Sequence, residues 1–392
     1  MLTKNLGEVL LSLGNEAHEL YLPREIKLLE HPPSPLVFLR EYVMPNIPVV
    51  IKNGVKHWPA IKKWTDDYLV NVLGNKSITV ALTPNGYADA PQGDYFVMPY
   101  EIETTFKNFL HDLQREDKTD VLYLQNQNSS FTKQFSELIP DAALDISWAS
   151  EAFGKIPDAI NFWMGSSNSV TSMHKDHYEN MYAVVRGAKK FILHPPTDLP
   201  YLIHKQYIPA RYKKENGVYK IFEERNIECC QICLKEDVST EMKHRNMATK
   251  VTHPTISTEI TQVNISNEVS NLNCIDKFNI DIKNTSDSIS INKQNISCLH
   301  DCHVLPRIPW IATNPLNLND RTSFLYKQSH PLEVTVQSGD LLYLPSLWFH
   351  HVQQEDNTIA INFWYDMDYD IKYNYFKFTE QINNLLKQTD IH

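Results

Sequence analysis

The segment VTSMHKDHYENMY, residues 170 to 182, contains two histidines and two acidic residues that could hold a metal ion. His174 and Asp176 are two positions apart, so in an extended segment both side chains point to the same face and can bind one ion. A chain of this size contains about one His-x-Asp pair by chance. The pair alone therefore leaves a second interpretation open, in which the histidine and the aspartate satisfy each other at the mouth of a barrel.

A third element strengthens the metal-binding interpretation. The segment WFHHVQ, residues 348 to 353, follows a Gly-Asp turn and the run LLYLP. Two imidazoles and one carboxylate on one face of an octahedron leave the opposite positions open, which is typical of non-haem Fe(II) oxygenases. The thiolates of structural zinc sites are absent from this part of the chain. Because neighbours on a strand point to opposite faces, only one of His350 and His351 can face the site.

Helices and short strands must position these groups. The chain has 392 residues and is 42% hydrophobic, which is enough to bury a sizeable core. Apolar spacing, capping residues and turn residues predict an α+β region over 1–120, a β-rich domain over 121–370 and a C-terminal helix over 371–392. The predicted helices are 1–20, 34–43, 65–74, 106–116 and 370–388. The predicted strands are 46–54, 77–84, 121–127, 159–165, 180–187, 189–196, 332–340, 341–345, 348–353 and 358–366. Many short strands at regular spacing predict a sandwich or a barrel.

Charge and hydropathy exclude several classes of protein. The net charge of −10 argues against a nucleic-acid-binding scaffold and is compatible with a basic substrate. No apolar run approaches the roughly 20 residues that span a bilayer, and the N-terminus has the pattern of an amphipathic helix rather than a signal peptide. We expect a cytoplasmic protein, present also in the nucleus, with no nucleic-acid or membrane partner.

All six cysteines lie between residues 229 and 302. The surrounding interval, 226–303, contains no Gly, Trp or Tyr and is rich in polar residues, which predicts a disordered insertion into the β domain. Its cysteines and histidines could bind zinc, but the long polar loop between the two halves makes closure costly. The zinc candidates are Cys230, Cys233, Cys298, His300, Cys302 and His303.

Several blocks of the chain resemble the JmjC (jumonji C) branch of the 2-oxoglutarate oxygenases, and more narrowly its lysyl hydroxylases. They are FWMGSSNSVTSMHKDHYENMYAVVRGAKKFILHPPTD, GDLLYLPSLWFHHVQQ and IAINFWYDMDYDIKYNYF, with VLYLQNQNSSF, PDAINFW and PVVIKNGVKHW in the same pattern. The resemblance covers nearly the whole chain outside the insertion. It implies a mainly β fold, a double-stranded β-helix (a jelly-roll, cupin-like barrel) with flanking helices.

The resemblance also implies a set of site residues. Iron is held by His174, Asp176 and His350, the first of the adjacent histidines, and no catalytic group is expected beyond this metal centre. The pair His177 and Glu179 is then not a ligand pair, because one centre cannot use both sets on one face. The implied contacts of the co-substrate 2-oxoglutarate are Tyr123, Thr171, Asn180, Lys189, Asn362 and Trp364. Lys189 supplies the cation that a buried carboxylate requires, and Lys190 should face the other side, whereas Tyr123 and Trp364 could also be plain core aromatics.

The activity implied by the resemblance is hydroxylation of a lysine at C3, with O2 as second co-substrate and succinate and CO2 as co-products. In that family the protein substrates are developmentally regulated GTP-binding proteins. Alternatives are a metallopeptidase acting on basic protein tails, a histone lysine demethylase, and a non-catalytic interaction module. A lysine ammonium requires carboxylates at the pocket mouth, for which Glu179, Asp366 and Asp368 are candidates. The C-terminal helix could form a homodimer or pack on its own barrel.

Overall fold

Two long, paired strands lie at the centre of the larger sheet. The computed structural model describes residues 2–115, 119–127, 129–225 and 305–389. Strands β11 (Tyr178–His194) and β17 (Phe349–Asp366) pair antiparallel along their whole length. The first half of β17 also pairs with β10 (Val170–His174), and its second half pairs with β9 (Ala159–Gly165). This exchange of neighbours brings the start of β17, which carries His350, beside the end of β10, which carries His174.

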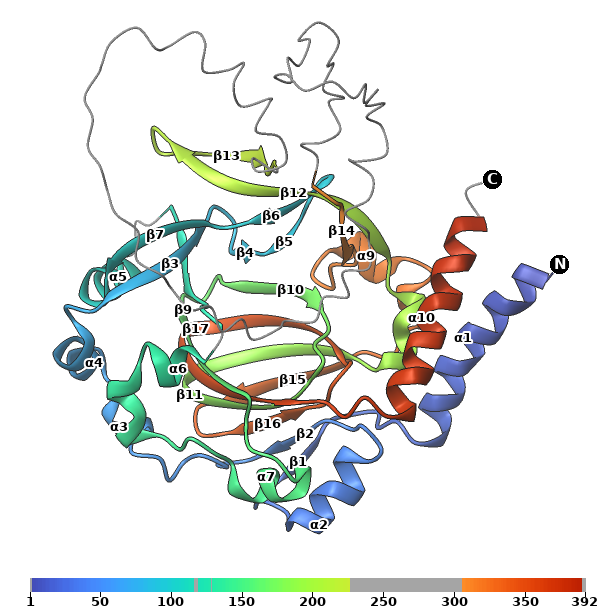
Figure 1. The fold of residues 1–392 in the computed structure, drawn as a ribbon, viewed down its shortest axis with the longest axis horizontal. Helices are drawn as coiled ribbons and strands as arrows, with labels where there is room; N and C mark the ends of the chain where they lie inside the picture. Colours follow the sequence, from blue (N-terminus) through green and yellow to red (C-terminus); the bar gives the residue numbers. More distant parts are fainter. Residues whose placement is uncertain (1, 116–118, 128, 226–304, 390–392) are drawn as a thin grey trace, which may run out of the picture. The chain divides into compact units, whose positions relative to one another are not determined.

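The described strands form two sheets. The larger has the order β1-β2-β16-β11-β17-β9-β8-β3-β7, with β10, β15 and β4 attached beside it. Its remaining strands are β1 (Lys27–Leu29), β2 (Val49–Ile51), β3 (Ser77–Thr83), β4 (Tyr87–Ala88), β7 (Tyr100–Thr105), β8 (Val121–Leu124), β15 (Leu332–Gln337) and β16 (Leu341–Leu344). The smaller sheet consists of β5 (Ala90–Gln92), β6 (Tyr95–Met98), β12 (His204–Glu215), β13 (Val218–Glu223) and β14 (Ile308–Ile311). The prediction of a mainly β jelly-roll barrel with flanking helices is confirmed (Figure 1).

Helices cover the outside of the barrel (Figure 1). They are α1 (Leu2–Leu20), α2 (Pro35–Phe38), α3 (Ala60–Lys63), α4 (Asp66–Leu73), α5 (Phe106–Gln114), α6 (Ser130–Lys133), α7 (Ser147–Phe153), α9 (Leu318–Thr322) and α10 (Ile371–Thr389). Shorter helical turns are η1 (Leu39–Val43), η2 (Ser136–Asp141), η3 (Pro196–Tyr201) and η6 (Tyr326–Gln328). Among the described helices, none is long and apolar enough to cross a membrane.

Local sequence explains where these helices begin and what they bury. The hydroxyls of Ser34, Thr65 and Thr105 accept hydrogen bonds from backbone N–H groups in the first turns of α2, α4 and α5. In α5 the apolar residues recur at helical spacing and are buried against the sheet: Phe106, Phe109, Leu110 and Leu113. The predicted helix 34–43 is α-helical only to Phe38 and continues as the π-helical turn η1.

The C-terminal helix α10 packs on its own barrel. Phe376 is buried in a cluster with Met173 and Phe349, and α10 also lies beside α1 (Figure 1). Other apolar side chains of α10, including Tyr375 and Phe378, stay exposed, so a homodimer through this helix remains a prediction.

Two strand predictions were wrong in the same way. Residues 180–187 and 189–194 belong to the single strand β11, and 349–353 and 358–366 belong to β17. In β11 the register shifts around Arg186 and Ala188, which marks a bulge, and Gly187 within it has φ +72°. A bulge bends a strand while the pairing continues on both sides, so a glycine and a charged residue here do not end the strand.

Replacing Gly187 with alanine is expected to lower the free energy of unfolding by about 1–3 kcal/mol. A Cβ there would lie 2.8 Å from Thr358 Oγ1, in addition to the strain of a positive φ. Urea unfolding measures the loss. The matched control is Gly93→Ala, since Gly93 has φ +60° but nothing within 4 Å of its Cβ position. Equal losses in the two variants would contradict the steric part of this account.

The chain divides into one compact unit of Met1–Glu224 with Leu305–His392 and a second unit of Arg225–Val304. The predicted disordered insertion over 226–303, with the candidate zinc ligands Cys230, Cys233, Cys298, His300, Cys302 and His303, lies outside the described residues. The predicted boundaries at residues 120 and 370 stay predictions.

Candidate metal centre and co-substrate cavity

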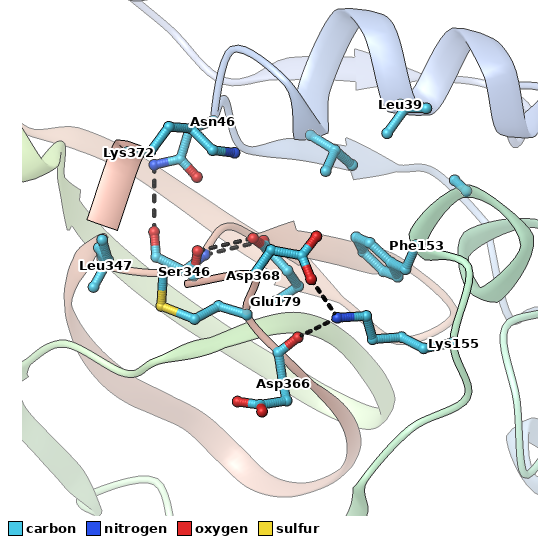
Figure 2. A pocket seen from close by; sticks show the side chains of 13 residues that line it. Leu39, Asn46, Phe153, Lys155, Glu179, Ser346, Leu347, Asp366, Asp368 and Lys372 are labelled. Atoms are coloured by element: carbon cyan, nitrogen blue, oxygen red, sulfur yellow. Dashed lines mark hydrogen bonds and ion pairs between the residues drawn. The ribbon is translucent and has the colours of Figure 1, made fainter. Parts of the chain in front are cut away.

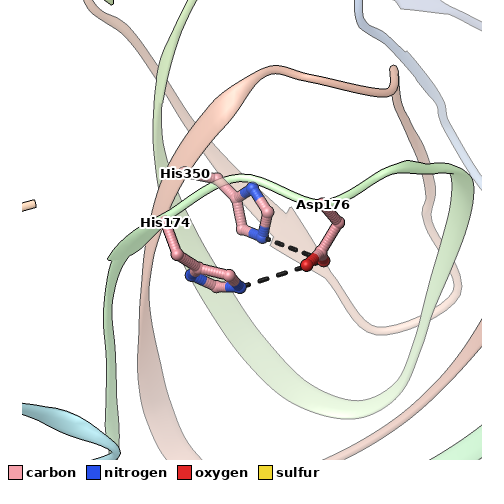
Figure 3. Close-up of side chains that lie close together, drawn as sticks. All are labelled: His174, Asp176 and His350. Atoms are coloured by element: carbon pink, nitrogen blue, oxygen red, sulfur yellow. Dashed lines mark ion pairs between the residues drawn. The ribbon is translucent and has the colours of Figure 1, made fainter. Parts of the chain in front are cut away.

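Three side chains converge where β10 ends and β17 begins (Figure 3). His174 and His350 are register partners across the two strands, and Asp176 follows in the turn after β10. The Nε2 atoms of His174 and His350 lie 3.8 and 3.7 Å from Asp176 Oδ2. One ligand atom from each residue lies within 4.8 Å of the other two, which leaves room for one ion between them.

Backbone carbonyls orient both imidazoles. The Nδ1 atom of His174 lies 2.8 Å from Ser172 O, and that of His350 lies 3.0 Å from Trp348 O. A carbonyl can only accept, so each Nδ1 carries a proton and donates it, and the ring nitrogen left for a metal ion is Nε2, on the side of Asp176. Burial also lowers the pKa of His350 to about 4, so this ring is neutral at physiological pH. Two imidazoles that present Nε2 and one carboxylate form a donor set that fits Fe(II).

The structure separates this set from three nearby residues in the sequence that could also bind a metal ion. His351 faces the other side of β17, is 1% exposed, and its ring nitrogens have no hydrogen-bond partner among the described residues. His177 packs near Tyr369 and Tyr373 of the C-terminal region. Glu179 accepts hydrogen bonds from the Tyr343 hydroxyl and from Ser346. The pair at 177 and 179 therefore does not converge on the triad.

A cavity of about 370 Å³ opens beside the triad. All six residues that the resemblance assigned to the co-substrate line it, together with the three candidate ligands: Tyr123, Thr171, His174, Asp176, Asn180, Lys189, His350, Asn362 and Trp364. The sequence prediction of where these residues lie thus agrees with the geometry, although their contacts with a co-substrate stay a proposal.

Lys189 is the unusual group in this cavity. It is 1% exposed and donates hydrogen bonds to the hydroxyls of Tyr123, at 3.1 Å, and Tyr182, at 2.7 Å. No carboxylate of the described residues pairs with it, and burial lowers its pKa from 10.5 to about 7. Its neighbour Lys190 faces outward and pairs with Glu333 at 2.8 Å. A buried cation without a counter-charge fits an anionic ligand.

Polar groups along the cavity wall hold one another in place. Asn362 accepts a hydrogen bond from Trp163 Nε1 at 2.8 Å and donates one to Asn180 Oδ1 at 3.1 Å. The Trp364 ring stacks on Tyr178 with centroids 4.8 Å apart, and its buried Nε1 has no partner among the described residues. This unsatisfied N–H is a donor available to an oxygen of a bound ligand.

The three carboxylates expected to receive a lysine do not line this cavity. Glu179, Asp366 and Asp368 surround a different pocket of about 70 Å³, where Lys155 donates to Asp366 O and Asp368 Oδ1 (Figure 2). For Glu179 the reason lies in the strand period. Asn180 faces the cavity, so its neighbour Glu179 must point to the opposite face of β11.

The sequence prediction also missed residues that line the cavity. Tyr182 is two positions from Asn180 on β11, so strand alternation could have identified it. Gln125 is likewise two positions from Tyr123, whereas Asp89, Phe96 and Trp310 reach the cavity from other parts of the chain, where no local pattern marks them.

Comparisons with known proteins agree with this geometry. Residues 35–371 match the model of the cupin-like domain family. The chain is 36% identical over 368 residues to the human (Homo sapiens) protein named bifunctional peptidase and (3S)-lysyl hydroxylase JMJD7, covering 93% of this chain and 92% of that protein. It is 34% identical over 389 residues to the Arabidopsis thaliana protein named lysine-specific demethylase JMJ32, covering 95% and 90%. It is 32% identical over 401 residues to JmjC domain-containing protein E of Dictyostelium discoideum, covering 96% and 94%.

Proposed function

Since the chain belongs to the cupin-like JmjC family of 2-oxoglutarate oxygenases, we propose that it is an Fe(II)- and 2-oxoglutarate-dependent protein lysyl hydroxylase. One observation supports this most strongly: the His174, Asp176 and His350 triad shares its cavity with a buried lysine that has no counter-charge among the described residues. The triad fits the metal and the lysine fits the dianionic co-substrate, so one cavity meets both requirements.

The metal would be held by Nε2 of His174, Nε2 of His350 and the carboxylate of Asp176. An iron centre with 2-oxoglutarate supplies O2 activation, and the net reaction converts a C–H group, O2 and 2-oxoglutarate into an alcohol, succinate and CO2. The chain's own contribution is orientation, since the two backbone carbonyls fix both imidazoles before any ion binds.

Lys189 would bind the distal carboxylate of 2-oxoglutarate. A charged carboxylate in a buried cavity needs a cation and hydroxyl donors, and the Lys189 ammonium with the Tyr123 hydroxyl provides both. Asn180 and the Trp364 N–H are further donors in the same cavity, and Asn362 holds the Asn180 side chain. Aromatic rings on the wall, including Trp163 and Tyr182, exclude water from the bound ligand.

The substrate class is the finer part of the proposal. The name of the human relative supports (3S)-hydroxylation of a lysine, and we extend this to a GTP-binding protein of the developmentally regulated class as substrate. The name of the plant relative favours a second candidate, lysine demethylation. The same human name includes peptidase activity, which is the third candidate.

One assay separates these candidates. The protein is incubated with Fe(II), ascorbate, 2-oxoglutarate and lysine-bearing peptides of such GTP-binding proteins, unmodified or methylated. A product about 16 Da heavier, formed with equal succinate, supports hydroxylation because one oxygen atom is inserted. Loss of a methyl group with formaldehyde would favour demethylation, and cleaved peptide without succinate would favour peptidase activity.

Binding of 2-oxoglutarate is expected to weaken as pH rises above about 7. The pKa of Lys189 is lowered to about 7 in the free protein, so above that pH the amine must take up a proton before it can pair with a carboxylate. The dissociation constant should rise by up to about tenfold per pH unit between pH 7 and pH 9, and change little below pH 7. Calorimetric titration with Mn(II) in place of iron measures this. A constant affinity from pH 7 to pH 9 would contradict a neutral Lys189 in the free protein.

A further inference from the structure

Among the described residues that line the cavity, one carboxylate is not part of the metal centre. It belongs to Asp89, which lies between β4 and β5 with φ +53°. Strand β4 pairs with β10, where Ala88 is the register partner of Thr171. The Ser172 hydroxyl also donates to Asp89 O at 3.0 Å. These contacts fix Asp89 next to the strand that carries His174.

The Asp89 carboxylate has unused acceptor capacity. Gln125 Nε2 donates to Asp89 Oδ2 at 2.9 Å, and no other described side chain donates to this carboxylate. An ionised carboxylate can accept about four hydrogen bonds. The nearby cation Arg211 is already paired with Glu224 at 3.0 Å and Glu101 at 3.4 Å. Burial raises the pKa of Asp89, so its charged form needs a partner that enters from the cavity.

Aromatic rings form the wall beside Asp89. Trp310 and Phe96 both line the cavity, with ring centroids 4.6 Å apart. The Trp310 ring stacks on His174 at 5.9 Å, and its Nε1 donates to the Ser172 hydroxyl at 3.1 Å, so its position is fixed relative to the metal centre. A carboxylate next to aromatic faces suits a cation on an aliphatic stem.

Asp89 and Lys189 lie at different places in the cavity wall. Asp89 lies beside β10 and accepts a hydrogen bond from Gln125, whereas Lys189 lies on β11 and donates to the hydroxyls of Tyr123 and Tyr182. The cavity therefore has an anion-binding region at Lys189 and a cation-binding region at Asp89. The two predicted ligands of the cavity carry the matching charges, since 2-oxoglutarate is an anion and a lysine side chain is a cation.

We propose that Asp89, positioned by Gln125, binds the ammonium group of the substrate lysine, with Trp310 and Phe96 against its aliphatic stem. This rests on the proposed function and specifies the form of lysine that is accepted. An ammonium has three N–H donors for Asp89, while a trimethylated lysine has none. The site thus selects unmodified lysine over trimethyllysine and over an uncharged side chain.

Binding of short peptides tests the assignment. The probes are acetylated Gly-Lys-Gly amide and its norleucine and trimethyllysine counterparts, added to the protein with Mn(II) and a non-reactive 2-oxoglutarate analogue and followed by NMR. We expect wild type to bind the lysine peptide at least about tenfold more tightly than the other two. Asp89→Asn should remove this preference, and Gln125→Ala should reduce it.

The matched control is Asp94→Asn, which removes an exposed carboxylate from the turn between β5 and β6, outside the cavity. It should keep the wild-type preference. Unchanged 2-oxoglutarate binding in Asp89→Asn verifies that this variant is folded. A lysine preference that survives in Asp89→Asn, or is absent in wild type, overturns the assignment. Failure of the proposed function is a separate result, namely no product heavier by about 16 Da in the hydroxylation assay.

Discussion

Replacing Lys189 with methionine is expected to weaken 2-oxoglutarate binding by at least about 100-fold, to the point where turnover is lost at ordinary co-substrate concentrations. Removing one partner of a buried charge pair typically costs about 3–5 kcal/mol, because the other charge stays buried without compensation. Methionine has a similar length and is apolar, so the cavity wall stays filled while the cation is lost. The measurement is the KM for 2-oxoglutarate from succinate formation, with direct titration as a second readout.

The control for this variant is Lys190→Met. Lys190 is the next residue on β11 but faces outward, where it pairs with Glu333. Its loss removes a surface ion pair worth about 0–1 kcal/mol and should leave the KM unchanged.

The Lys189→Met protein should unfold at a temperature no lower than wild type, because it no longer buries a lysine. A KM within about threefold of wild type in Lys189→Met would show that the co-substrate binds elsewhere, since threefold corresponds to less than about 1 kcal/mol.

The second large effect is expected for Asp176→Ala, which should lower turnover by more than about 1,000-fold, equivalent to roughly 4 kcal/mol. Asp176 supplies the one negative charge of the triad, and without it two neutral imidazoles hold a divalent ion weakly. Its side chain is 26% exposed in the turn after β10, so truncation creates no core cavity. The contact of its backbone carbonyl with the Leu347 N–H is kept in the variant.

Metal binding can be read independently of turnover. Mn(II) should raise the unfolding temperature of wild type, because an ion that binds only the folded state stabilises it. Asp176→Ala should lose this shift. The matched control Asp368→Ala removes a carboxylate that pairs with Lys155 at the other pocket, and it should keep the shift. An undiminished Mn(II) shift in Asp176→Ala would exclude Asp176 as a ligand.

Spacing along the chain was enough to single out several site residues. The two-residue spacing of His174 and Asp176 predicted that they could bind one ion, and they do converge, although Asp176 follows the end of β10 and is not on the strand. A lysine on an apolar strand needs polar partners, and Lys189 is buried against the hydroxyls of Tyr123 and Tyr182. The choice of His350 over His351 came from the family resemblance, since alternation only required that the two face opposite sides. The alternation argument depends only on local backbone geometry, which β-strands repeat along their length.

The errors arose where proximity along the chain was taken for proximity in space. Glu179 was proposed as a substrate contact because it lies near the metal motif, yet its neighbour Asn180 takes the inward position on β11. Asp89 and Trp310 were missed because they are far apart in the sequence, one before the insertion and one after it. The pairing of β4 with β10 and of β14 with β12 brings both to the cavity. The bulge at Gly187 likewise looked like the end of a strand, since sequence cannot show that the neighbouring strands continue past it.

The central claim is that one cavity binds both Fe(II) and 2-oxoglutarate, and a crystal structure of the protein with Mn(II) and a non-reactive 2-oxoglutarate analogue tests it most directly. We predict one ion bonded to Nε2 of His174, Nε2 of His350 and the carboxylate of Asp176, with the far carboxylate of the analogue on Lys189 and Tyr123. An ion bound away from this triad, or an analogue whose far carboxylate does not reach Lys189, would contradict the account.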